Sequence, residues 1–210
     1  NNVNKFFILP AGSVCEKYQS KIYKITNYLK KRKSDFLFIT ASENNAWLFN
    51  IRGRDAKYTP IPYSFVLIDK NKNIKFFCDL KKLSSTFKSH FKKVEFLDIK
   101  ICFKILSKIK RSKFIVDKNS CSYFFENIIS KNNKILNQQD PIYAFKAIKA
   151  KKEINTMEQG QVLHIISTDP GAVKDFESFA NQTGNELLES VEKDDGKFYF
   201  LMKKKQHPLE

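Results

Sequence analysis

The stretch Asn44–Asp55, which reads NNAWLFNIRGRD, sets the fold of the first part of the chain. It starts with an apolar run, and we expect Ala46–Asn50 to form a buried strand. Asn50–Gly53 follows as a tight turn, because Asn and Gly tolerate the backbone conformations that turns require. A strand that ends in an Arg-Gly corner presents a guanidinium at the rim of a sheet, where binding surfaces are often built.

The same corner contains Trp47, Arg52, Gly53 and Asp55. Trp47 is either a core aromatic residue of the strand or a ligand contact, and the sequence leaves both interpretations open. Arg beside Gly in a turn is rarely there for packing alone. Arg54 and Asp55 are expected to form a surface ion pair worth well under ~1 kcal/mol.

Strands alternate with helices along the first 140 residues. This alternation predicts an α/β domain with a mixed sheet flanked by helices. The expected strands are residues 35–40, 46–50, 64–69, 74–78, 94–97 and 113–116. The expected helices are residues 16–33, 101–110 and 120–130, with a further lysine-rich helix capped by Asp79.

A second, smaller pattern begins at Asp140-Pro141, which is typical of a helix start. It predicts a helix over 141–157, a strand over 161–167, a helix over 171–182, and a hairpin of strands 185–191 and 197–202. The charge balance changes close by. Residues 1–159 contain 32 Lys+Arg and 13 Asp+Glu, whereas residues 160–205 contain 6 and 8. Both observations favour a domain boundary in this region.

Composition narrows the possible partners. The chain has a net charge of +16, but only four basic residues are Arg, and no recognition-helix motif occurs. We therefore expect solvated lysine faces and no specific nucleic acid partner. No apolar run approaches the ~20 residues of a membrane span, so no membrane partner is expected. Four scattered cysteines without a CxxC pair indicate free thiols, no zinc site and a cytoplasmic location.

Several blocks of the first part resemble the non-catalytic domain of the Xaa-Pro aminopeptidases, a creatinase/prolidase N-terminal-like domain. Besides NNAWLFNIRGRD, the resemblance is carried by Phe7–Pro10, Asp140–Ile142, Lys146–Lys149 and Lys152–Ile154, and it covers residues 5–153. It implies a metallopeptidase, usually manganese-dependent, that removes the residue before an N-terminal-side proline. Such chemistry needs two metal ions held by carboxylates and histidine, with further histidines beside them.

This chain contains only three histidines, at positions 90, 164 and 207. The resemblance therefore implies that the dimetal catalytic domain is absent, with no catalytic residue, metal ligand or cofactor in this chain and manganese only in that domain. It also implies roles in oligomer contacts and in walling the substrate entrance, and by position Trp47, Arg52, Gly53 and Asp55 would lie nearest to that entrance. The expected partners are a second copy or a peptidase catalytic domain, with a peptide substrate only where that domain is present.

The last part of the chain resembles the TusA/SirA sulfur carriers over residues 147–205. The matching blocks are Gln159–Leu163, Ser167–Phe176, Gln182–Leu188 and Phe198–Lys204. This resemblance implies a two-layer α/β sandwich and a persulfide-carrying cysteine in a CPxP motif. That motif would fall at Tyr143–Lys146, and no cysteine follows Cys121. We therefore do not expect this chain to share the sulfur-transfer activity of that family.

Taken together, the resemblances predict a first domain over residues 1–153 and a TusA-like module over 154–205. The two share helix 141–157, with Lys134–Asn137 standing in for the carrier's first strand, and residues 206–210 are a tail or tag remnant. Asp169 and Gly171 are an anion-binding candidate or an ordinary helix cap. The alternative functions are a sulfur-relay or tRNA-thiolation-type carrier that uses Cys121, or a protein-interaction module.

Overall fold

The computed structural model describes residues 4–14, 16–56, 59–167, 172–194 and 196–205, without the side chains of residues 144, 146–152 and 182. The chain divides into two compact units, Asn1–Pro141 and Ile142–Glu210, called unit 1 and unit 2 below.

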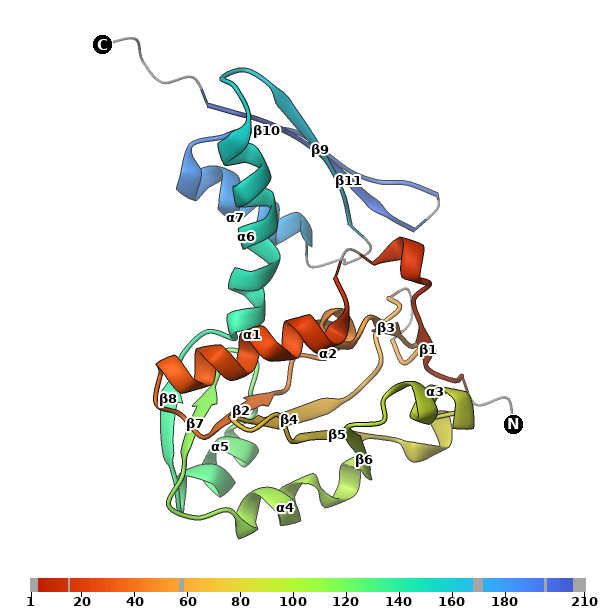
Figure 1. Cartoon of the computed structure of the whole chain (residues 1–210), viewed down its shortest axis with the longest axis vertical. Coiled ribbons are helices and arrows are strands. Elements are labelled where there is room, and N and C mark those ends of the chain that lie inside the picture. The colour runs from red at the N-terminus through yellow and green to blue at the C-terminus, as the bar shows by residue number, and fades with distance from the viewer. Residues whose placement is uncertain (1–3, 15, 57–58, 168–171, 195, 206–210) are drawn as a thin grey trace. The chain divides into compact units, whose positions relative to one another are not determined.

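A six-stranded mixed sheet forms the centre of unit 1, in the order β6-β5-β4-β2-β7-β8 (Figure 1). Its strands are β2 (Phe36–Ile39), β4 (Phe65–Asp69), β5 (Ile74–Cys78), β6 (Val94–Asp98), β7 (Lys113–Val116) and β8 (Lys134–Asn137). Only β4 is antiparallel to its neighbours. Five strands therefore end on the same side, which we call the carboxyl end of the sheet. Separately, β1 (Phe7–Ile8) pairs with β3 (Ile51–Arg52).

Helices cover both faces of this sheet (Figure 1). One face carries α1 (Tyr18–Lys31) and α2 (Ser42–Phe49), and the other carries α4 (Cys102–Lys108) and α5 (Tyr123–Ser130). Helix α3 (Ser85–His90) and the 3-10 turns η1 (Ala11–Ser13), η2 (Leu80–Lys82) and η3 (Ile99–Ile101) complete the unit. Phe49 of α2 lies edge-on to Phe76 and Phe91, with ring centroids 5.2 and 5.9 Å away. Phe38 and Phe114 of the sheet pack with Leu106 and Ile129 on the α4–α5 face.

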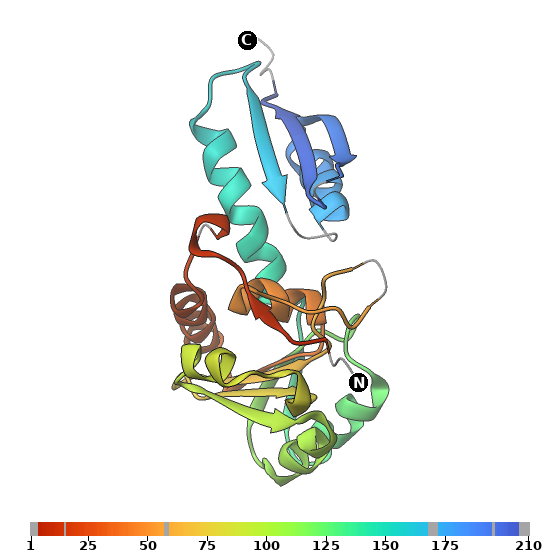
Figure 2. The same ribbon diagram turned by 90° about the vertical axis from the view of Figure 1, so that its right-hand side faces the viewer.

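Unit 2 is a two-layer α/β sandwich (Figure 2). Its antiparallel sheet has the order β10-β11-β9, formed by Glu186–Glu192, Phe198–Lys203 and Val162–Ser167. Helices α6 (Pro141–Thr156) and α7 (Ala172–Thr183) form the second layer. Ile154, Phe179 and Met202 make its core. The predicted fold class, a mixed sheet flanked by helices followed by a small two-layer sandwich, is confirmed.

The expected strand over Ala46–Asn50 is wrong, because these residues belong to α2 and its C-cap. Five of the eight residues of α2 are buried. A helix that is buried on most sides has no continuous polar face, so an apolar run within it cannot be told from a strand by its pattern. The expected turn is also different: Asn50 ends α2 in the left-handed conformation, with φ 55°, and Ile51–Arg52 are β3.

Two other expectations need correction. Lys134–Asn137 does form a strand, but it pairs in parallel with β7 at the edge of the unit 1 sheet, so it does not complete the sheet of unit 2. Asp79 accepts a hydrogen bond from the Lys81 backbone and so caps the short turn η2, not a long helix. The helix that follows, α3, has Ser84 as its own cap.

Candidate functional site at the Arg52 corner

A buried lysine, Lys21, contacts the C-terminal end of α2. Lys21 is 4% exposed, and its Nζ lies 3.9 Å from the centroid of the Trp47 ring. The same ammonium donates to the backbone oxygen of Trp47 and to Oδ1 of Asn50, each at 2.6 Å. Asn50 in turn donates from Nδ2 to the backbone oxygen of Glu16 at 2.9 Å. Half-buried Trp47 thus takes part in the packing that fixes the end of the helix.

The Arg52 side chain is turned into the protein and not towards solvent. It is 8% exposed, and Nη1 donates to the backbone oxygens of Ile51 at 2.9 Å and Ala46 at 3.5 Å. The charge therefore lies beside carbonyl groups near the C-terminus of α2, where a cation is favourable. The next residue, Gly53, must lack a side chain, because a Cβ atom there would come within 2.7 Å of the Pro62 Cα atom.

Asp55 pairs with Lys82, not with its neighbour Arg54 as the sequence suggested. Its side chain is 9% exposed, and Oδ2 also accepts from the backbone N–H of Tyr63 at 2.7 Å. Asp55 therefore joins the segment after β3 to both the start of β4 and the 3-10 turn η2. Adjacency in sequence is a poor guide to ion pairing, because Lys82 is brought in by the sheet topology.

A buried polar network near the corner was not predicted. Asn44 is fully buried and donates from Nδ2 to Oδ2 of Asp140 at 2.8 Å, and the Asp140 backbone N–H donates to Oδ2 of Asp117 at 3.0 Å. Asn45, also fully buried, donates to the backbone oxygen of Ser64 at 2.9 Å. The two asparagines precede the apolar run in NNAWLFN, and only their place on a helix instead of a strand turns both inward.

The described thiols lie in the core. Cys78, Cys102 and Cys121 are buried and free. Burial raises the pKa of the Cys121 thiol to about 12, with the nearby Glu126 carboxylate adding to the rise. A thiol that is buried and protonated at neutral pH is a poor nucleophile, which weighs against Cys121 as a surrogate sulfur carrier.

The remaining candidates are in unit 2. Asp169 and Gly171 lie outside the described residues, as do residues 206–210. Tyr143–Lys146, where the carrier motif would fall, lies in the first turns of α6. None of the described helices is long and apolar enough to cross a bilayer.

Comparison with known proteins divides the chain in the same region. The family model of the creatinase/prolidase N-terminal domain matches residues 1–153, and that of sulfurtransferase TusA matches residues 147–204. The chain is 28% identical over 162 residues to Xaa-Pro aminopeptidase 1 of Dictyostelium discoideum, covering 76% of this chain and 25% of that protein. It is 65% identical over 57 residues to the sulfur carrier protein TusA of Allochromatium vinosum, covering 27% of this chain and 74% of that protein.

Among solved structures, the chain is similar to the X-prolyl aminopeptidase of Caenorhabditis elegans, described as a cytosolic enzyme with a dinuclear active site. The TM-score is 0.61 at 20% sequence identity, and the match covers 72% of this chain and 27% of that one. This likeness concerns the fold. The chain spans about a quarter of the length of the aminopeptidases that it matches.

Proposed function

Since the chain belongs to the creatinase/prolidase N-terminal domain family through residues 1–153 and to the TusA family through residues 147–204, we propose that unit 1 acts as the non-catalytic domain of an Xaa-Pro aminopeptidase. In this role it binds a peptidase catalytic domain, contributes to oligomer contacts and walls the substrate entrance. Manganese and the peptide substrate belong to that catalytic domain, and the assembly is cytosolic, as is the C. elegans enzyme.

The observation that carries this proposal is the similarity to the Dictyostelium aminopeptidase, which extends over 76% of this chain. The contacts of the corner residues favour a structural role beside a substrate entrance over a catalytic role. Arg52 and Asp55 are held by backbone and lysine contacts, and Gly53 keeps the chain close to Pro62. Such a rigid corner can shape an entrance without changing conformation.

The proposal is tested by mixing the purified chain with the separately expressed catalytic segment of the Dictyostelium enzyme and measuring hydrolysis of a Xaa-Pro peptide with manganese. We expect no turnover by the chain alone and a complex when the catalytic segment is added. Trp47→Ala should raise the KM of the complex, whereas Tyr23→Ala, at an exposed tyrosine of α1, serves as the matched control. Turnover that follows the chain alone through purification would overturn the proposal.

For unit 2 we propose a TusA-like module that carries no sulfur, because no cysteine follows Cys121. Incubation with a cysteine desulfurase, followed by mass spectrometry of the intact chain, should show no persulfide on Cys121. A persulfide at that residue would favour the sulfur-relay alternative instead.

A further inference from the structure

The lysine excess of unit 1 is concentrated at the end of its sheet opposite the carboxyl end. Five separate segments meet there: the link from α1 to β2, the β4–β5 turn, and the links that lead into β6, β7 and β8. We call them together the basic rim, residues 30–35, 69–73, 92–93, 108–113 and 131–134. The rim contains fourteen Lys and Arg residues against two Asp, a net charge of +12.

The opposite end of the same sheet is different. The segments that join the strands there, residues 40–45, 50–64, 79–84, 98–101, 117–122 and 138–140, contain seven basic and six acidic residues, a net charge of +1. A general excess of lysine along the chain does not explain why the excess lies at one end of the sheet. The placement therefore calls for a separate cause.

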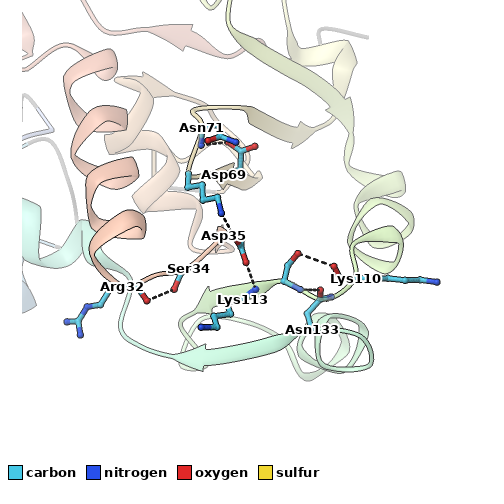
Figure 3. A network of polar contacts seen from close by, with 10 residues as sticks. Arg32, Ser34, Asp35, Asp69, Asn71, Lys110, Lys113 and Asn133 are labelled. Atoms are coloured by element: carbon cyan, nitrogen blue, oxygen red, sulfur yellow. Dashed lines mark hydrogen bonds and ion pairs between the residues drawn. The ribbon is translucent and has the colours of Figure 1, made fainter.

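Every basic side chain of the rim is exposed. In Figure 3 the side chains of Arg32 and Lys110 extend away from the ribbon. The two acidic residues are engaged with the turns themselves. Asp35 accepts from Lys70 Nζ at 2.8 Å and from the Lys113 backbone N–H at 2.9 Å. Asp69 accepts from the backbone N–H groups of Asn71 and Asn73. Little negative charge is thus presented outward.

Backbone conformation gives a second, independent observation that favours a functional role for the rim. Among the described residues, four non-glycine positions have positive φ: Lys33, Asn50, Lys72 and Arg111. Three of the four lie in the rim. Glycine or asparagine is the usual residue in this conformation, since a larger side chain costs about 1 kcal/mol or more there. In all three turns this unfavourable conformation is occupied by a basic residue, which is consistent with a functional use of the charge.

We propose that the basic rim binds the phosphate backbone of a nucleic acid without reading its bases. Six strands spaced ~4.8 Å apart give the rim a length of about 24 Å, enough to follow several phosphates. Only two of its basic residues, Arg32 and Arg111, are arginines, so bidentate base recognition is not its basis.

An anionic membrane is the less suitable partner for this surface. Membrane-binding surfaces combine basic residues with apolar side chains that insert. The exposed Tyr23 lies beside the rim, with Lys72 Nζ 5.1 Å from its ring centroid. A tyrosine beside a lysine suits stacking on an unpaired base better than insertion into lipid.

The test compares two variants of the full chain with equal net charge. The rim variant carries Lys31→Glu, Lys93→Glu, Lys110→Glu and Lys131→Glu; the control variant carries Lys17→Glu, Lys81→Glu, Lys100→Glu and Lys104→Glu. All eight lysines are exposed, so both variants should fold, which thermal melting checks. Binding of a fluorescent 20-nucleotide RNA and of a 20-base-pair DNA is measured by anisotropy over a range of salt concentrations.

We expect the rim variant to lose at least about tenfold in affinity at 100 mM salt. The slope of log affinity against log salt concentration should become shallower by about one for each substituted lysine that contacts a phosphate. The control variant should lose less than about threefold, because long-range charge effects are screened at this salt concentration. Equal losses in the two variants would mean that net charge alone binds nucleic acid, and the proposal would fail. Tighter binding to vesicles of anionic lipid than to RNA at equal phosphate concentration would also overturn it.

Discussion

At the carboxyl end of the unit 1 sheet, charged and polar side chains are turned into the protein: Arg52 donates to backbone carbonyls, Asp55 pairs with Lys82, and Asp140 accepts from Asn44. At the opposite end, fourteen basic side chains are exposed and the backbone adopts less favourable conformations to carry three of them. The first end uses polar groups to hold the fold, whereas the second leaves its charge facing water. Residues with the most chemical character can therefore be structural, whereas ordinary lysines from five separate segments form the exposed charged surface.

The largest difference should appear in thiol chemistry, because Cys78, Cys102 and Cys121 all lie at the carboxyl end of the sheet and are buried. Burial is the main cause that raises the pKa of each to about 12. In a Cys15→Ser background at pH 8, a disulfide reagent should therefore react with the native chain at least about a thousandfold more slowly than with the unfolded chain.

The same pKa shifts make stability depend on pH. The folded pKa of each thiol lies above the unfolded value of about 8.5. The free energy of unfolding is therefore highest below that pH. It decreases as the pH rises towards about 12, because the thiols ionise in the unfolded chain but not in the folded one. Denaturant titrations between pH 8 and pH 11 would follow this loss. Rapid labelling of the native chain at pH 8 would mean that the carboxyl end is open.

Gly53→Ala should be the most damaging single change to stability. The new Cβ atom would lie 2.7 Å from the Pro62 Cα atom, and relieving this overlap requires movement of the backbone. We expect a loss of about 3 kcal/mol in the free energy of unfolding, measured by urea denaturation. Gly12→Ala is the matched control, because its Cβ atom would meet nothing within 4 Å, and it should change stability by no more than about 0.5 kcal/mol.

Asp140→Ala removes the acceptor of the Asn44 amide, which is fully buried. The cost should be about 2 kcal/mol, since a buried donor then loses its partner. Asp98→Ala removes the same charge at the same end of the sheet, but Asp98 is partly exposed and caps only the turn η3, so it should cost about 1 kcal/mol or less. Equal losses in the two variants would show that the buried network contributes nothing special.

Asp35 is the acidic residue that ties the rim turns together, and its removal should have the smallest effect. The hydrogen bond from Lys70 and the backbone N–H of Lys113 lower the pKa of Asp35. A lowered folded pKa stabilises the protein above the unfolded value of about 4, and this contribution disappears as the pH falls through the folded pKa. Asp35→Asn should cost about 1 kcal/mol at pH 7 and less at pH 2, as measured by chemical denaturation at both pH values.

Much of the fold could be predicted from local pattern. The apolar spacing of α1 and the turn-rich link between β4 and β5 are properties of neighbouring residues, and both predictions are confirmed. The identity of α2 could not be predicted in this way, because a mostly buried helix has no polar face. The partner of Asp55 could not be predicted either, since Lys82 reaches it only after β4 and β5 have paired.

The basic rim illustrates the same limit at a larger scale. The sequence shows the total charge of +16, and its lysines are spread along the chain. Five segments separated by up to about 100 residues come together because the five strands that follow them, β2, β5, β6, β7 and β8, run in one direction. The strand topology creates such a surface, so no single stretch of the sequence reveals it.

Helix α6 gives the chain an order of assembly during synthesis. Residues 147–153 are matched by both families, yet α6 packs with unit 2, while unit 1 ends at Pro141. When the ribosome has released residue 141, every strand of the six-stranded sheet has been made, so unit 1 can fold before α6 finds its sheet. The emerging helix must then wait for β11, whose Met202 joins Ile154 in the core. For that interval of synthesis α6 exists without the strands that it packs against.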